Sequence, residues 1–206
     1  FPKSLQTLTF GGGFNQSLEG LVLPDLRSLT FGCKANESLE TISLPESLES
    51  LRFSGSFNRS IDNVTLPSNL QSLTFGRNFN QSMDNVAFPL HLHNLIFGRL
   101  FNQSLEHVTF PPDLRSLTLA TDYAPSLQGF NQTLEGVTLP SSLESLTLGY
   151  HFNQSLQGVV FPEHLESLSF GHLYNQSLEG VRFPESLQTL KFGDSFQHSL
   201  KDVLPC

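Results

Sequence analysis

Prolines recur along this chain at a fixed interval of 22 residues. Two series keep the interval and three further prolines fall within one residue of it: Pro45, Pro67, Pro89 and Pro111; Pro140, Pro162 and Pro184; and Pro2, Pro24 and Pro205. The repeated unit is P-x-x-L-x-S-L-T-F-G-x-x-F-N-Q-S-L-E-G-V-x-F, and nine copies cover Pro2 to Leu204. A period of this length is typical of stacked repeat architectures, so residues 1–206 are predicted to be a single repeat domain.

Each unit contains two stretches that end in strand-like alternation. L-x-x-L-x-F occurs as Leu70, Leu73 and Phe75, and L-x-x-V-x-F as Leu105, Val108 and Phe110. Alternating apolar and polar residues indicate a strand with one buried face, and the punctuation by Gly and Pro leaves no room for a helix. We therefore predict an all-β-rich solenoid with two short parallel strands per coil, a rung of about 4.8 Å per coil and shallow curvature.

The pentapeptide FNQSL is predicted to form a corner of each coil. Its first residue points inward in one aromatic column: Phe14, Phe57, Phe79, Phe101, Phe130, Phe152, Tyr174 and Phe196, with Ala35 as a gap. A second column is Phe10, Phe31, Phe53, Phe75, Phe97, Phe170 and Phe192, with Leu119 and Leu148 substituted. Corner amides lack ladder partners, so the following asparagines are expected to form a buried ladder. They are Asn15, Asn36, Asn58, Asn80, Asn102, Asn131, Asn153 and Asn175, and the hydroxyls two residues later are expected to act likewise.

These motifs resemble the FNIP repeat, a subclass of leucine-rich repeats. F-N-Q-S-L together with L-P-x-S-L-x-S-L-T-F-G carries the resemblance, which covers every coil. It implies a right-handed solenoid similar to leucine-rich-repeat proteins and used for protein interaction. It implies no shared catalytic residues.

Charge and hydropathy exclude two classes of partner. The net charge of −8 argues against nucleic acid, which requires clustered Lys and Arg. No apolar run approaches the ~20 residues of a membrane span, so direct membrane insertion is not expected. The chain is expected to be soluble, in an unassigned compartment. Because it begins at Phe1 without Met, either a leader has been removed or this is the ordered part of a longer protein.

Two cysteines stand nearly eight coils apart. Cys33 and Cys206 are separated by roughly 38 Å at the strand spacing, whereas a disulfide needs Cα atoms within about 7 Å. They are not expected to pair with each other. Cys206 could pair outside this segment, so the redox compartment stays open.

The largest break in the repeat is an insertion of seven residues in the sixth unit. Residues 120–129 replace the usual three-residue link and must loop out of the coil. Asp122 and Tyr123 are candidate contact residues on this loop, and an insertion without function is the alternative.

Candidate chemical sites have structural explanations. N-x-S/T occurs at Asn63 and at the eight ladder asparagines; burial of the ladder would leave Asn63 as the credible glycosylation acceptor. His91 and His93, and His151 with His172, lack a third ligand at metal-like spacing. Neither a catalytic triad nor a phosphate loop is present, so we predict no enzyme activity, no cofactor and no metal site.

One column of the repeat is acidic. Glu19, Glu40, Asp62, Asp84, Glu106, Glu135 and Glu179 stack every ~4.8 Å, interrupted by Gln157. Such a column must be solvated or partnered by cations or a basic protein.

Two columns point outward from the first strand. They are Thr7, Ser28, Ser50, Ser72, Asn94, Ser116, Ser145, Ser167 and Thr189; and Thr9, Thr30, Arg52, Thr74, Ile96, Thr118, Thr147, Ser169 and Lys191. The array is similar to threonine faces of ice-binding solenoids, which makes ice or crystal binding a minor alternative. Thr also suits exposed strands in general, and Arg52, Ile96, Arg77 and Arg99 interrupt the small residues. The face is therefore better suited to docking a protein.

The sequence predicts a non-catalytic protein-interaction or scaffolding module, with a partner of unknown identity. The predicted partner-binding residues are Arg52, Thr74, Ile96, Thr118, Asp122 and Tyr123. The alternative is a structural subunit of a larger protein assembly, membrane-associated or not. Its basis is that the end coils lack polar caps, so that missing sequence or a neighbouring subunit is expected to cover them.

Overall fold

The computed structural model describes residues 1–14, 16, 20–32, 39, 42–53, 55–119 and 129–200. Nine strands follow one another in chain order: β1 (Thr7–Thr9), β2 (Ser28–Phe31), β3 (Ser50–Phe53), β4 (Ser72–Thr74), β5 (Asn94–Phe97), β6 (Ser116–Leu119), β7 (Ser145–Leu148), β8 (Ser167–Ser169) and β9 (Thr189–Lys191). The described residues contain no helix, and therefore none that could cross a membrane. Several residues considered above lie outside the described part: Asn15, Ser17, Glu19, Cys33, Lys34, Ala35, Asn36, Ser38, Glu40, Asp122, Tyr123 and Cys206.

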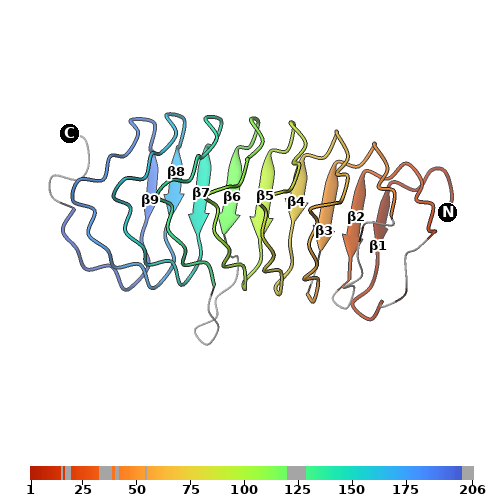
Figure 1. Ribbon diagram of the computed structural model, residues 1–206, viewed down its shortest axis with the longest axis horizontal. Coiled ribbons are helices and arrows are strands. Elements are labelled where there is room, and N and C mark those ends of the chain that lie inside the picture. Colours follow the sequence, from red (N-terminus) through yellow and green to blue (C-terminus); the bar gives the residue numbers. More distant parts are fainter. Residues whose placement is uncertain are drawn as a thin grey trace.

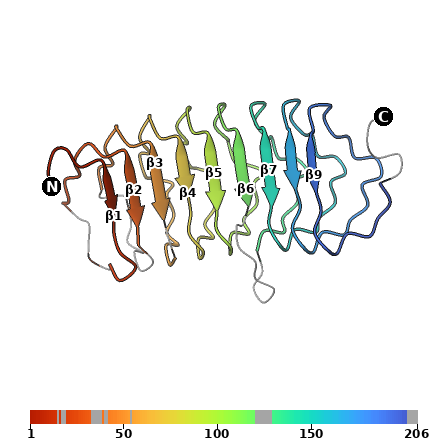
Figure 2. The same ribbon diagram turned by 180° about the vertical axis from the view of Figure 1, so that it is seen from behind.

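The strands form one parallel sheet in the order β1 to β9, with each strand beside its sequence neighbours. Equivalent repeat positions are paired, as in Leu51 with Leu73 and Leu73 with Leu95. Figures 1 and 2 show the coils stacked along one long axis with β1 and β9 at opposite ends. The predicted solenoid is confirmed. Its register follows from the repeat, because a slip of one residue would expose every inward Leu and Phe.

Three β-turns close a typical coil, as the coil that contains β5 shows. Backbone hydrogen bonds run from Leu92 N to Pro89 O at 3.1 Å, from Phe101 N to Gly98 O at 3.2 Å and from Val108 N to Leu105 O at 3.2 Å. The third turn occupies the L-x-x-V stretch that was predicted to begin a second strand. No second strand forms in the described residues. The turn has Gly at its third position in several coils, with a φ of 80° at Gly136, a conformation that strands do not adopt.

Two stacked columns of aromatic rings fill the core. Within one coil Phe75 lies 3.9 Å from Phe79, centroid to centroid, and each stacks on the next coil, at 5.4 Å from Phe75 to Phe97 and 6.3 Å from Phe79 to Phe101. All four side chains are buried, as are the leucines of β2 to β8. The described members of both columns were predicted from the repeat. Parallel stacking follows because identical side chains occupy identical sites one rung apart.

The asparagine ladder is present, and it crosses coils. Asn102 N donates to Asn80 Oδ1 at 2.8 Å, and Gln103 Nε2 donates to the same oxygen at 3.0 Å. The same backbone bond recurs from Asn80 to Asn58 and along the later coils. The glutamine of FNQ therefore has a defined role as a second donor to the oxygens of Asn58, Asn80, Asn102, Asn131 and Asn153.

Two details of the ladder prediction are corrected by the structure. Its asparagines are half-buried rather than buried, and Asn58 is exposed, because only the carbonyl end of each side chain turns toward the next coil. The hydroxyls two residues later were expected to serve amides of their own and of the neighbouring coil. The hydrogen bonds described for them lie within their own turn, as from Glu106 N to Ser104 Oγ at 3.2 Å. A short hydroxyl reaches the amide two residues later more readily than one in the next coil.

The glycine after each strand sets how closely the coils approach. A Cβ on Gly98 would overlap the Gly76 carbonyl oxygen, and the same holds for Gly171 over Gly149. Gly11, in the first coil, has nothing within 4 Å of that position. Glycine is therefore required at this position by the close packing of neighbouring coils, and not by the local backbone conformation.

The seven-residue insertion leaves the stack intact on both sides. The rings of Phe101 and Phe130 lie 6.2 Å apart, and Asn131 N donates to Asn102 Oδ1 at 2.9 Å although 29 residues separate them. Coil six thus rejoins the repeat at Gly129.

The end coils are packed less completely than the middle. Leu8 and Phe10 at one end, and Leu190 and Phe192 at the other, are only partly buried, whereas their counterparts in central coils are fully buried. Within the described residues β1 and β9 each pair on one edge only. Both ends therefore present core surface and strand edge.

Candidate interaction surface

The sheet presents an outward face of short polar side chains, because Leu and Phe turn inward at alternate positions. On this face the four predicted residues of the strands form one row across β3 to β6. Arg52 pairs with Thr74, Thr74 with Ile96, and Ile96 with Thr118. Arg52 is exposed and the other three are half-buried. The sheet thus brings together four residues that are 66 positions apart at the extremes (118 − 52). The remaining predicted residues, Asp122 and Tyr123, lie outside the described residues.

Two further arginines follow the strands at the next corner. Arg77 and Arg99 occupy the same position of adjacent coils, which are joined there by a 3.0 Å hydrogen bond from Leu100 N to Arg77 O. Arg99 Nε is buried and has no hydrogen-bond partner among the described residues. Such a donor carries an energetic cost until an acceptor reaches it.

Histidines and a tyrosine occupy this corner beyond the insertion. Tyr150 and His172 stack with centroids 5.0 Å apart, and His172 Nδ1 lies 3.2 Å from Asp194 Oδ2. His151 Nδ1 accepts a hydrogen bond from Gly129 N at 3.2 Å, which requires the neutral ring with its proton on Nε2. Partial burial and, secondarily, the Arg99 guanidinium lower the pKa of His151 from its usual 6.5. Burial and the Arg99 charge both favour the neutral imidazole, which is the form that can accept the hydrogen bond from Gly129 N.

His91 and His93 are the other histidine pair that the sequence analysis considered as a metal site. His91 Nδ1 lies 2.8 Å from Asp113 Oδ2 in the next coil, and both side chains are largely exposed. Among the described residues no three His, Cys, Asp or Glu side chains are grouped so as to hold a metal ion.

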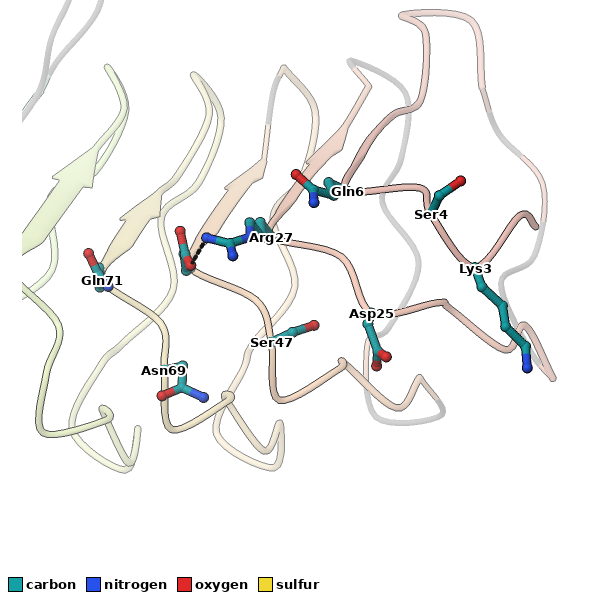
Figure 3. A pocket seen from close by; sticks show the side chains of 9 residues that line it. Lys3, Ser4, Gln6, Asp25, Arg27, Ser47, Asn69 and Gln71 are labelled. Atoms are coloured by element: carbon teal, nitrogen blue, oxygen red, sulfur yellow. Dashed lines mark hydrogen bonds and ion pairs between the residues drawn. The ribbon is translucent and has the colours of Figure 1, made fainter.

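A polar hollow near the first coils was missed by the sequence interpretation. It has a volume of about 430 Å³ and lies over the strand-side corner of the first four coils. Figure 3 shows its lining: Lys3, Ser4, Gln6, Asp25, Arg27, Ser47, Asn69 and Gln71, with the 2.9 Å ion pair between Arg27 and Glu49 drawn across it. The available signal was the residue missing between Pro24 and Leu26, where Leu26 N bonds Pro24 O at 2.7 Å in a tighter turn than in other coils.

The acidic column lies at a different corner from the arginines. The backbone N–H groups of Asp62, Asp84, Glu106, Glu135 and Glu179 each donate to the hydroxyl two residues earlier. These carboxylates are exposed, except that Asp62 is half-buried with one oxygen lacking a partner among the described residues. The column therefore forms a solvated edge.

Potential glycosylation sites are more accessible than predicted. Asn63 is exposed, in agreement with its interpretation as an acceptor. The ladder asparagines are not protected by deep burial, but their oxygens are hydrogen-bonded to the next coil, as Asn153 Oδ1 is to Asn175 N at 2.8 Å. Their structural role thus depends on hydrogen bonding.

Comparisons with known proteins agree with this architecture. The family model described as FNIP Repeat matches residues 1–34, 14–56, 36–78, 57–100, 130–172 and 174–206. A crystal structure of CroV588, described as a novel circular LRR protein structure, is similar with a TM-score of 0.85 and 39% sequence identity. That similarity covers 97% of this chain and 28% of the CroV588 chain, so this chain spans under a third of its length. No curated protein matches the sequence.

Proposed function

Because the chain belongs to the FNIP repeat family, we propose that it is a non-catalytic protein-interaction or scaffolding module that binds through the outward face of its sheet. The observation that carries this proposal is the row of Arg52, Thr74, Ile96 and Thr118, in register across four strands. It brings a cation and an aliphatic side chain to the middle of a face of small hydroxyl residues. A protein partner needs such a combination of flat area and distinct anchors.

The rigidity of the face supports the proposal. The strands are held by ladder bonds on both sides, and the core beneath them is packed with stacked rings. Side chains on such a framework are positioned before binding, so little conformational entropy is lost on association. Ordering threonine and serine side chains on binding costs little conformational entropy, because these side chains are short.

A non-catalytic role is supported by the distribution of reactive groups. His91 and Asp113 lie at one corner, whereas His151 and His172 lie at another. The serines on the sheet face lie in a column that holds no histidine. The ice-binding alternative is weaker, because Arg52, Ile96 and Lys191 interrupt the threonine column.

The test is capture of partners with matched variants of the whole chain. Tagged wild-type protein is purified gently from its native cells and compared with Ile96→Thr plus Thr74→Lys on the face, and with Val160→Thr on another face. Val160 is the matched control because it is β-branched, apolar and 79% exposed. A stoichiometric partner is expected with wild type and Val160→Thr, and a strong reduction with the sheet-face variant. Equal capture by all three would overturn the sheet face as the binding surface.

A second candidate is a structural segment of a larger solenoid assembly. It is favoured by the partly exposed core residues and single-edged strands at both ends, and by similarity to part of a protein described as circular. Coverage of the ends by further coils or by a neighbouring subunit would bury these groups. Sedimentation velocity over a range of concentrations tests this candidate. A stable monomer at every concentration would count against it.

A further inference from the structure

Positive charge is concentrated in one part of an otherwise acidic chain. The chain carries 11 Lys and Arg against 19 Asp and Glu. In the third, fourth and fifth units, the strand and the following corner span residues 50–60, 72–82 and 94–104. These segments contain Arg52, Arg59, Arg77 and Arg99 and no acidic residue. The acids of the same units lie at other corners, so the coil separates the two signs of charge.

Three of these arginines lack an ion-pair partner. Elsewhere on the strand side, arginines pair with glutamates of the next coil, Arg27 with Glu49 at 2.9 Å and Arg115 with Glu144 at 3.5 Å. Within the described part of the chain no salt bridge involves Arg52, Arg77 or Arg99.

Arg99 provides the most specific observation. Its Nε is buried without a hydrogen-bond partner among the described residues, and the residue as a whole is half-buried. A guanidinium in this position offers its remaining donors to solvent and to an incoming carboxylate. The Arg99 guanidinium contributes to the lowered pKa of His151, so its charge reaches that ring.

The backbone positions that carry the three arginines are spaced to suit an extended segment. Arg77 and Arg99 lie one coil apart, about 4.8 Å at the backbone, and Arg77 is three residues, about 10 Å, beyond the strand position that pairs with Arg52. Ile96 lies in the same row, two strands from Arg52, and is the one aliphatic side chain in its outward column. An extended peptide advances about 3.3 Å per residue, so a few residues span the group.

We propose that Arg52, Arg77, Arg99 and Ile96 form a docking site for an extended, acidic protein segment that carries an aliphatic side chain. The inference rests on the proposed interaction function and assigns the chemistry of its partner. Carboxylates accept paired hydrogen bonds from the guanidinium groups, and the aliphatic side chain contacts Ile96. Nucleic acid does not fit, because the acidic column and the net charge of −8 would repel its phosphates. A second copy of the chain, docking through its own acidic column, is the competing occupant.

The experiment is selection of random linear peptides displayed on phage, using wild-type protein and four variants as bait. Arg77→Gln removes one of the two positive charges at the corner, and the double variant Arg77→Gln/Arg99→Gln removes both. Arg52→Thr restores the residue found at neighbouring positions of the column. Lys191→Thr is the matched control, because Lys191 occupies the same outward column at the far end of the sheet. Far-UV circular dichroism and melting temperature confirm that each variant is folded.

Wild type and Lys191→Thr are expected to enrich peptides rich in Asp and Glu with an aliphatic residue. The best synthetic peptide, labelled with fluorescein, is then titrated in an anisotropy assay. Its affinity should fall about tenfold or more in the Arg77→Gln/Arg99→Gln variant, less in the single variants, and steeply with added salt. A Gln-for-Glu version of the peptide should bind wild type as weakly as the acidic peptide binds the double variant.

Three other results would overturn the proposal in distinguishable ways. Enrichment of uncharged peptides by wild type and by all the arginine variants alike would retain the interaction function and reject the acidic partner. Failure to enrich any peptide would count against both. Concentration-dependent dimers that disappear in Arg77→Gln would identify a second copy as the occupant.

Discussion

Asn102 Oδ1 accepts the backbone N–H of Asn131 at 2.9 Å across 29 residues of chain, in the same geometry that joins coils separated by 22. The hydrogen bond shows that the ladder follows the stack and not the sequence interval. Gln132 Nε2 donates to the same oxygen at 3.1 Å. Each asparagine therefore serves the coil that follows it.

Removing one rung of this ladder should destabilise the protein. Asn102→Ala leaves the half-buried Asn131 N–H and one side-chain amide without their acceptor, a loss of about 1–3 kcal/mol. Urea unfolding followed by circular dichroism measures the change. Gln197→Ala is the control, because the Gln197 backbone donates to Asn175 and its exposed side chain receives no ladder bond within the described residues. Equal losses in the two variants would contradict this account.

Glycine after the strand should be required only where a coil lies beneath it. In Gly98→Ala the new methyl group overlaps the Gly76 carbonyl, and the backbone must shift, at a cost of about 3 kcal/mol or more. Gly11→Ala has open space and should change stability by less than about 0.5 kcal/mol. Thermal unfolding of both variants tests the contrast. If Gly98→Ala melted with the wild type, close contact between coils could not explain the glycine.

Replacing Tyr174 by Phe is expected to stabilise the protein. Tyr174 is fully buried in a column of phenylalanines, and its hydroxyl has no hydrogen-bond partner among the described residues. The same burial raises the pKa of Tyr174 above its usual range. Removing an unsatisfied hydroxyl relieves a desolvation cost of about 1–3 kcal/mol, offset by any void that remains. A lower melting temperature for Tyr174→Phe would show that the hydroxyl is satisfied in solution.

Acidification should weaken the contact between His151 and Gly129. The folded-state pKa of His151 is depressed, so its contribution to stability is present above the unfolded value of 6.5 and is lost as pH falls through the folded pKa. His151→Asn supplies an oxygen that accepts at every pH. Melting temperatures are compared at about pH 8 and about pH 5. Wild type should lose more stability than His151→Asn, whereas His164→Asn, at an exposed site, should follow wild type.

Deleting residues 121–127 should preserve the fold, because it restores the 22-residue interval (29 − 7 = 22) between Asn102 and Asn131. A shorter link costs less closure entropy, so stability should be unchanged or higher by about 0.5 kcal/mol. The deletion also removes Asp122 and Tyr123 together. Partner capture that survives it intact would exclude those two residues from the binding surface.

The sequence predicted the solenoid correctly because its signals repeat. The aromatic columns of Phe75 and Phe79 follow from the interval alone, since identical residues in identical coils must stack. The second strand was predicted from the alternation in Val108-Thr109-Phe110, but the bond from Val108 N to Leu105 O turns the chain there. A run of three alternating residues fits a turn followed by an extended segment as well as it fits a strand, and only the path of the coil distinguishes them.

The burial of single side chains, and the groups with which they form hydrogen bonds, were less predictable from the sequence. The ladder asparagines were expected to be buried because they repeat, yet Asn58 is exposed. The hollow beside Arg27 is lined by residues of four coils, and the lack of a partner for Arg99 Nε among the described residues depends on which groups surround it. Repetition identifies the positions that face inward but does not report how far the neighbouring coil covers them.

The sequence by itself determined the period, the inward columns and the parallel register of this protein, because each depends only on the same unit recurring along the chain. The tertiary structure decided which polar groups meet across coils, which corners turn, and which arginines of the strand side pair with a glutamate of the next coil. These relationships join residues from different repeats, and they arise only when stacking brings the coils within about 4.8 Å of one another.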